Sequence, residues 1–207
     1  MRDAAYKRKR KNGCFGCIGS LIKLLIFLAV IIIAANFVVK TYYGSDISKK
    51  IKQTQYPIKY EYFVEKYSEE YNLDKYLVYA VIRTESRFDK YAVSSADAKG
   101  LMQLTDETGS HCAKKIKLDG YSESALFDPE INIRLGCYYL NHLKSVYKDT
   151  NTALAAYNGG PGNVDKWLSD PNCVDDSGKL INIPFKETRN YIVRVNEAME
   201  MYKSIYE

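Results

Sequence analysis

The sequence has few of the residues and motifs on which hydrolytic, nucleotide-dependent and metal-dependent sites are commonly built. It contains two His among 207 residues, His111 and His142, and neither belongs to an H-E-x-x-H zinc motif. It has no G-x-S-x-G nucleophile motif and no Walker A loop. A pairing of Cys112 with His142 stays open as a nucleophilic arrangement, although nothing near either residue supports it. We therefore expect neither a metal ion nor a cofactor.

The five cysteines do not form a recognisable framework either. Cys14 and Cys17 make one C-x-x-C pair, without the second pair of a zinc finger or the βαβ pattern of a redox motif. They precede an apolar run, whereas the cysteine of a bacterial lipoprotein would follow it. The plain interpretation is two small residues beside a membrane segment. The other three are odd in number, so we predict no disulfide among them: Cys112, Cys137 and Cys173.

The net charge of +5 arises at the N-terminus. Residues 1–11 hold six basic residues and one acidic residue, which accounts for the whole excess. From Tyr56 onward there are 19 basic and 23 acidic residues, a net charge of −4. An acidic main domain argues against nucleic acid as its partner.

A long apolar run follows the basic residues. Residues 21–39 read LIKLLIFLAVIIIAANFVV, and about 20 helical residues span the ~30 Å of a bilayer core. Lys23 lies near one end, where its side chain can reach the headgroups. The positive-inside rule then places residues 1–19 in the cytoplasm as a basic tail. We predict a single-pass span over residues 20–39, with the rest of the chain outside the cell membrane.

Two other interpretations of this run stay open. A signal peptide would be cleaved after small residues, and Ala34-Ala35 is a poor site of that kind. A buried core helix is disfavoured by the adjacent basic block and by apolar residues on every face. Residues 40–57 are polar and predict a flexible stalk, which would keep the domain within roughly 20–25 Å of the membrane. Residues 58–207 then form the main domain.

The main domain shows helical periodicity and no persuasive set of alternating strands, so we predict a mainly α fold. Asp74 is a natural N-cap, and the apolar residues that follow it recur at helical spacing. Glu85 comes eleven residues after this cap, near the end of the expected helix. Apolar walls there would disfavour the charged carboxylate and raise its pKa. The plain alternative is a solvated Glu85 paired with Arg83 or Arg87.

Three ordered motifs decide between these interpretations. Residues 85–103 read ESRFDKYAVSSADAKGLMQ, with Glu-Ser, an aromatic residue, Ala-x-Ser and Gly-Leu-Met-Gln in that order. The segment ALAAYNGGPGNVDKW contains Ala-Tyr-Asn, and PFKETRNYIVRV contains Glu-Thr-x-x-Tyr. Together they resemble the soluble lytic transglycosylase family over residues 73–195.

This resemblance implies a lysozyme-like fold and cleavage of the β-1,4 bond between N-acetylmuramic acid and N-acetylglucosamine in peptidoglycan. It makes Glu85 the single catalytic acid, without a metal. It also implies a set of substrate-binding positions, with Gly100 as a turn or a close approach to glycan: Ser86, Ser94, Met102, Gln103, Tyr157, Asn158, Glu187 and Tyr191.

The sequence departs from the family pattern at three positions. Asp97 stands where the family usually has Gly, Asp106 where Pro is common, and Gly159 where Ala is usual. None of them is the acid, so we expect effects on loop rigidity and substrate fit rather than loss of activity.

Three other functions stay open beside a membrane-anchored lytic transglycosylase that remodels the cell wall. A hydrolytic muramidase, similar to goose-type lysozyme, would admit water in place of the sugar's own hydroxyl. A non-catalytic glycan-binding protein of the envelope would not need the acid. A factor that opens the wall for a secretion or conjugation machine would use the same chemistry.

Overall fold

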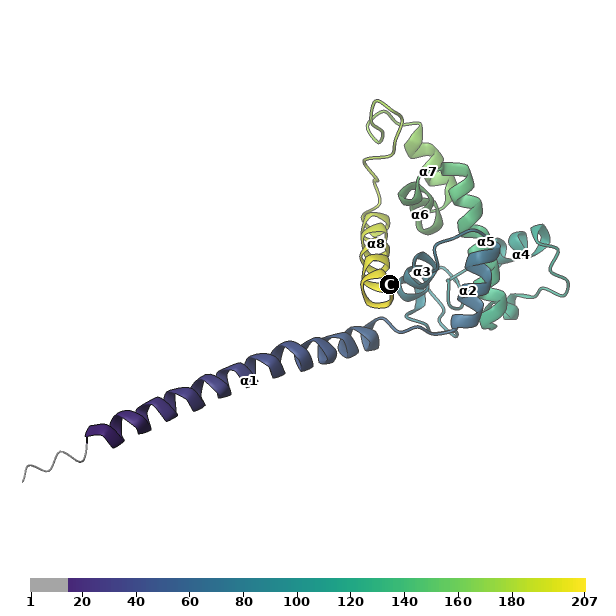
Figure 1. Ribbon diagram of the computed structural model, residues 1–207. Coiled ribbons are helices and arrows are strands. Elements are labelled where there is room, and N and C mark those ends of the chain that lie inside the picture. The colour runs from purple at the N-terminus through teal and green to yellow at the C-terminus, as the bar shows by residue number, and fades with distance from the viewer. Residues whose placement is uncertain (1–14) are drawn as a thin grey trace, which may run out of the picture. The chain divides into compact units, whose positions relative to one another are not determined.

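A computed structural model describes residues 15–207, which divide after Lys52 into two units. The first unit consists of most of helix α1, and the second is a helical domain that begins at Gln53 (Figure 1). The basic residues of the expected cytoplasmic tail, from Arg2 to Lys11, and Cys14 lie outside the described residues.

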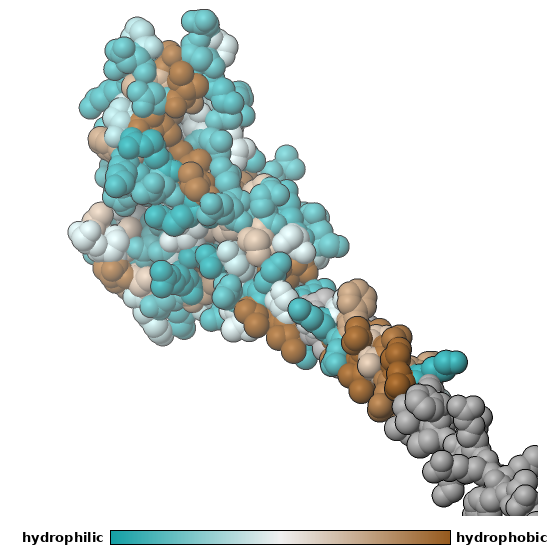
Figure 2. Space-filling model, turned by 90° about the vertical axis from the view of Figure 1, so that its left-hand side faces the viewer, coloured by the Kyte–Doolittle hydropathy of each residue, from teal (hydrophilic) through white to brown (hydrophobic). Residues whose placement is uncertain are grey.

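Helix α1, Phe15–Gln55, carries the apolar run. Its part from Ile22 onward has a mean hydropathy of 2.8 in its most apolar window and is long and apolar enough to cross a membrane. None of that window is buried, and apolar side chains stand exposed on this helix (Figure 2). This exposure argues against a buried core helix.

The structure differs from the expected flexible stalk. Residues 40–55 continue α1 as a helix instead of forming a random coil. This polar stretch holds a single helix-weakening residue, Gly44, and the helix ends only where Tyr56 precedes Pro57. The residue before a proline is disfavoured in the α conformation, which explains the end point. Sixteen further helical residues add about 24 Å of rigid length.

The main domain is built of helices, as predicted. Its α-helices are α2 (Glu61–Glu70), α3 (Lys75–Ser86), α4 (Asp106–Lys115), α5 (Pro129–Tyr147), α6 (Thr150–Gly159), α7 (Pro161–Leu168) and α8 (Lys186–Tyr206), with one 3-10 helix, η1 (Glu123–Phe127). No strand occurs among the described residues, which hold only three isolated β-bridges.

Helix α3 is the centre of the core. Asp74 caps it as predicted, because its side chain accepts a hydrogen bond of 2.8 Å from the backbone N–H of Tyr76. Val78, Val81 and Ile82 are fully buried, and α3 packs most extensively against α8. The core therefore fixes the direction in which the last turn of α3 projects its side chains.

The three cysteines of the domain are free, buried thiols. Burial raises the pKa of the Cys112 thiol to about 12, so it stays protonated. His142 stacks on Tyr138, and no hydrogen bond joins it to Cys112 within residues 15–207. The arrangement of Cys112 with His142 is therefore unsupported as a nucleophilic pair.

Candidate active site

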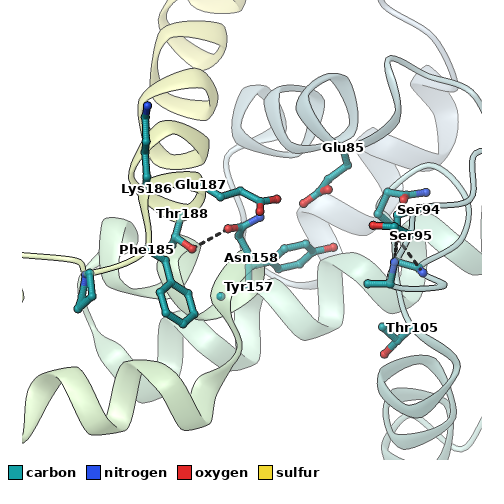
Figure 3. Close-up of a pocket in the computed structure, with 15 residues that line it drawn as sticks. Glu85, Ser94, Ser95, Thr105, Tyr157, Asn158, Phe185, Lys186, Glu187 and Thr188 are labelled. Carbon is teal, nitrogen blue, oxygen red and sulfur yellow. Dashed lines mark hydrogen bonds between the residues drawn. The ribbon is translucent and has the colours of Figure 1, made fainter.

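Glu85 lies in the last turn of α3, at the point where the chain leaves the helix. Arg87 and Phe88 follow with positive φ angles of 53° and 66°, so the backbone turns sharply and exposes this turn to a cleft. The cleft has a volume of about 760 Å³. Its lining comes from α3, the 94–105 loop, α6 and the start of α8 (Figure 3).

Glu85 is partly buried as a residue, and it lines this cleft. Desolvation raises its pKa to about 7, with a further upward contribution from the negative charge of Glu187. The nearby Tyr191 hydroxyl and the charge of Arg194 oppose this shift. Glu85 forms no ion pair with Arg83 or any other described residue. The solvated, ion-paired alternative for Glu85 is therefore wrong.

A clamped loop, residues 99–103, forms one wall beside Glu85. Asn132 of α5 holds it: Nδ2 donates to the carbonyl oxygens of Lys99 (3.0 Å) and Leu126 (2.8 Å), and Oδ1 accepts from the Met102 N–H (2.7 Å). Asn132 was not predicted from the sequence. The signal that could have identified it is an amide residue on the expected apolar face of a helix, because a buried amide needs hydrogen-bond partners.

The same hydrogen bonds leave no room for a side chain at Gly100. Its φ is +77°, and an added Cβ would lie 2.1 Å from the Leu126 carbonyl oxygen and 2.4 Å from Asn132 Nδ2. The close approach made possible by Gly100 is therefore to the protein's own backbone and to Asn132.

Three residues expected to bind substrate lie behind the cleft wall instead. Ser86 Oγ donates to the Leu101 carbonyl (2.8 Å), which ties α3 to the clamped loop. The Met102 side chain is fully buried against Gly136. Tyr191 is 1% exposed and lies near the Glu85 carboxyl. Direct sugar contact by Ser86, Met102 or Tyr191 is not what the structure shows, because none lines the cleft.

Gln103 and Ser94 line the cleft as expected. Gln103 Nε2 donates to the carbonyls of Ala92 and Gly100, both at 3.0 Å, so its Oε1 is the group left to face a ligand. Ser94 Oγ accepts from the N–H of Ala96 (3.3 Å) and of Ala98 (3.1 Å), which shapes the loop.

Tyr157, Asn158 and Glu187 also line the cleft. The Tyr157 hydroxyl donates to the Met102 carbonyl (2.8 Å), so its oxygen can still accept a hydrogen bond from a ligand. Asn158 Oδ1 accepts from Thr188 Oγ1 (2.8 Å), so its Nδ2 can donate to a ligand. Several further lining residues were not predicted from the sequence: Ser95, Thr105, Phe185, Lys186 and Thr188.

The structure shows the contacts of two residues that depart from the family pattern, Asp97 and Gly159. Asp97 has a φ of +59°, a left-handed conformation that favours Gly, and its carboxylate pairs with Lys99 at 2.6 Å. Lys99 also pairs with Glu123 at 2.7 Å, so the strained position is tied into an ion-pair network. At Gly159 an added Cβ would lie 3.1 Å from Thr188 Oγ1, a tight contact beside the cleft.

The part of the chain that the structure describes has no group of three or more His, Cys, Asp or Glu residues that could hold a metal ion. The functional groups that line the cleft are the carboxyl groups of Glu85 and Glu187, the Lys186 ammonium group, and several amide and hydroxyl groups.

A mainly helical domain whose cleft holds a carboxyl of raised pKa is the arrangement expected of a lysozyme-like protein. Residues 62–177, more than half of the chain, match the transglycosylase SLT domain family, and the chain belongs to this family. This membership confirms the resemblance found in the sequence.

Relatives agree in sequence and in structure. Membrane-bound lytic murein transglycosylase C of Edwardsiella ictaluri is 35% identical over 71% of this chain and 47% of its own length. Soluble lytic murein transglycosylase of Escherichia coli K12 is 32% identical over 69% of this chain and 23% of its own. This chain therefore spans about half the length of the first relative and about a quarter of the length of the second.

Two solved structures give the same result. The 70 kDa soluble lytic transglycosylase of Escherichia coli has a TM-score of 0.67 at 31% identity, covering 74% of this chain and 25% of that one. A complex of the 70 kDa soluble lytic transglycosylase with bulgecin A has a TM-score of 0.68 at 28% identity, covering 82% and 29%.

Proposed function

We propose that this chain is a peptidoglycan lytic transglycosylase. It cleaves the β-1,4 bond between N-acetylmuramic acid and N-acetylglucosamine and leaves a 1,6-anhydromuramic end. One observation carries the proposal: the cleft holds a carboxyl, Glu85, whose pKa is raised to about 7. A group with this pKa is populated both as an acid and as a base at neutral pH. The names of the relatives support murein as the substrate.

The first step breaks the glycosidic bond. Protonated Glu85 donates its proton to the bridging oxygen as the C1–O bond of the muramic residue breaks, so N-acetylglucosamine leaves as an alcohol. The carbonyl oxygen of the muramic 2-acetamido group stabilises the positive charge that develops at C1. Gln103 Oε1, Asn158 Nδ2 and the Tyr157 hydroxyl would hold the sugars, since these three residues line the cleft.

The second step restores the enzyme without consuming water. Glu85, now a carboxylate, takes the proton from the C6 hydroxyl of the same muramic residue, and that oxygen bonds to C1. The attacking group is already part of the bound sugar, so no second molecule has to be captured. The same carboxyl therefore gives a proton and then receives one.

Product analysis tests this proposal. Full-length protein in detergent is incubated with peptidoglycan in H₂¹⁸O, and the released fragments are examined by mass spectrometry. We expect anhydro ends that lack one water and carry no ¹⁸O. Reducing ends labelled with ¹⁸O would contradict the transglycosylase reaction, and no cleavage at all would favour the non-catalytic glycan-binding alternative.

Glu187 gives specific support to a second candidate, a hydrolytic muramidase. It reaches from α8 toward Glu85 in Figure 3, and its charge raises the pKa of Glu85. Two carboxylates that face each other across a cleft can activate a water molecule as well as protonate the leaving group. If the products carry ¹⁸O, the Glu187→Gln variant should lose that incorporation.

The membrane arrangement belongs to the same proposal. Helix α1 is apolar enough to span a membrane, and a relative is named as membrane-bound. We assign residues 1–19 to the cytoplasm, residues 20–39 to a single span, residues 40–57 to a stalk and residues 58–207 to the catalytic domain outside. Protease added to intact spheroplasts should degrade the domain. Protection of the domain would contradict this topology, and contacts with wall-building or secretion machinery are open to test once it is established.

A further inference from the structure

A tight hairpin, residues 93–99, forms part of the cleft wall. Its two sides meet in the β-bridge between Val93 and Lys99, and the Ser94 N–H donates to the Ala98 carbonyl (3.0 Å). The turn closes where the Asp97 N–H donates to the Ser94 carbonyl (3.0 Å). We refer to this segment as the wall hairpin, because four of its residues line the active-site cleft: Ser94, Ser95, Ala96 and Ala98.

A hairpin of this shape favours Gly at the position that Asp97 occupies. Its three-residue loop ends in a residue with left-handed backbone, and the φ of Asp97 is +59°. Gly adopts this conformation freely because it has no Cβ, whereas Asp adopts it at a cost. A contact that stabilises Asp97 therefore stabilises the whole wall hairpin.

The Lys99 ammonium group supplies that contact. Its Nζ lies 2.6 Å from Asp97 Oδ1 and 2.7 Å from Glu123 Oε1, and it donates to the Asp97 carbonyl oxygen (3.0 Å). These three acceptors match the three N–H donors of an ammonium group. Glu123 is the first residue of η1, so the ion pairs join the wall hairpin to a separate element.

The burial of Lys99 makes these ion pairs necessary. The Lys99 side chain is 9% exposed, whereas those of Asp97 and Glu123 are 72% and 52% exposed. A buried ammonium group is costly unless carboxylates pair with it. Movement of the wall hairpin away from η1 would separate the buried cation from a partner, so the ion pairs oppose that movement.

The three charged residues act from outside the cleft. Asp97, Lys99 and Glu123 do not line it, although their neighbours in the wall hairpin do. The backbone of Lys99 also belongs to the clamped loop, since its N–H donates to the Leu104 carbonyl (2.9 Å) and its carbonyl accepts from Asn132 Nδ2 (3.0 Å). An effect of these charges on a bound sugar therefore reaches it through the cleft wall.

On the basis of the proposed function, we infer that Lys99 is a positioning residue for glycan binding. Its ion pairs with Asp97 and Glu123 hold the wall hairpin in the conformation that presents its hydroxyl groups to the sugars. Glu85 lies on α3, outside this network, so the catalytic acid keeps its own position. The ion pairs therefore determine the affinity for glycan and leave the chemical step unchanged.

Two measurements on full-length protein in detergent test this inference. Calorimetry gives the Kd for soluble glycan fragments of peptidoglycan in the Glu85→Gln background, and kinetics with Glu85 intact give kcat and KM. We expect Lys99→Met to raise Kd and KM about fivefold while kcat changes less than about twofold, the pattern of lost uniform binding. Lys99→Arg keeps the cation and should remain close to the wild type.

A second variant and a control complete the design. Glu123→Gln changes an exposed side chain outside the cleft and should raise Kd and KM about twofold to threefold with kcat unchanged. It decides the question if Lys99→Met does not fold. Lys75→Met is the matched control, because Lys75 forms a 2.8 Å ion pair with Glu65 outside the cleft. This control should keep the wild-type Kd, KM and kcat.

The other outcomes overturn the inference in distinguishable ways. Unchanged Kd and KM in Lys99→Met and Glu123→Gln would remove the positioning role and leave the proposed function standing. A loss in kcat alone would show that the network supports the chemical step instead of binding. A loss in Lys99→Arg equal to that in Lys99→Met would assign the effect to packing instead of charge. Absence of both glycan binding and cleavage in the wild type would remove the inference and the proposed function together.

Discussion

At the scale of a single residue, two opposing effects set the pKa of Glu85: desolvation raises it, and Tyr191 and Arg194 lower it. Its position in the cleft keeps the carboxyl partly away from water, which favours the protonated form. Tyr191 and Arg194 limit that effect, so the pKa is raised to about 7 and no further. The balance suits a group that must act first as an acid and then as a base.

The Glu85→Gln variant should lose cleavage while it keeps the fold. Gln has nearly the same shape but no proton of suitable acidity, and general acid–base groups contribute about 10²–10⁴-fold to rate. The rate of release of soluble fragments from peptidoglycan measures the loss. Glu107→Gln, at an exposed acidic residue in the first turn of α4, is the control and should retain wild-type activity. Wild-type activity in Glu85→Gln would remove Glu85 from the reaction.

The same residue should make stability depend on pH in a defined direction. The folded pKa of about 7 exceeds the ordinary value of 4.5, so the folded state holds the proton between these values and the unfolded state releases it. Stability contributed by protonated Glu85 is therefore fully present below pH 4.5 and is lost as pH rises through 7. The loss approaches about 3 kcal/mol, since one pKa unit is 1.36 kcal/mol.

Urea denaturation at pH 4, 6 and 8 tests this direction. The single tryptophan, Trp167, is buried in the domain and reports its unfolding by fluorescence. We expect Glu85→Gln to match the wild type near pH 4 and to exceed it in free energy of unfolding by up to about 3 kcal/mol at pH 8. A variant less stable than the wild type at pH 8 would contradict the raised pKa.

At the scale of elements, the clamped loop depends on one side chain of α5. Asn132 satisfies two carbonyl groups and one N–H group, and all of these bonds are buried. Asn132→Ala leaves the Leu126 carbonyl and the Met102 N–H without these bonds, while the Lys99 carbonyl keeps the Leu104 N–H at 3.1 Å. Each unsatisfied buried group costs about 1–3 kcal/mol. We therefore expect a loss of several kcal/mol in the free energy of unfolding and a lower kcat, because Gln103 and the Tyr157 contact lie on this loop.

A control variant at a surface asparagine separates the loss of the loop's hydrogen bonds from a general effect of replacing asparagine with alanine. Asn196→Ala removes a surface hydrogen bond of 2.9 Å to Asn151, which is outside the cleft. It should change stability by less than about 1 kcal/mol and leave kcat unchanged. Equal behaviour of the two variants would show that the loop does not depend on Asn132.

The sequence predicted helices well where a local signal marks their ends. Asp74 is an N-cap whose side chain accepts the expected backbone hydrogen bond, and α3 begins where predicted. The stalk was predicted incorrectly as coil, because polarity alone does not break a helix that lacks Pro. The position of Glu85 at a helix end followed from counting residues after the cap.

The sequence could predict only part of the candidate site, because it does not determine the direction of each side chain. Motif positions indicate which residues gather, but not which face of the loop each side chain takes. Gln103 and Met102 are neighbours, yet one lines the cleft and the other fills the core. Asn132 bonds to Met102 and Lys99, which lie 30 and 33 residues earlier in the chain, and only tertiary packing brings these segments together.

At the scale of the whole molecule, the two units are expected to be energetically separate. The domain from Gln53 onward has its own core around α3, α5, α6 and α8, and such a unit can fold alone. Residues 53–207 without α1 should show the same urea midpoint by Trp167 fluorescence as the full chain in detergent. A midpoint shifted well below that of the full chain would show that α1 supports the domain.

The most direct test of this account is a ¹³C NMR titration of the Glu85 carboxyl group, assigned by comparison with the Glu85→Gln variant. The structure predicts a midpoint near pH 7. A midpoint near the ordinary value of 4.5 would contradict it, because Glu85 would then hold no proton to donate at neutral pH.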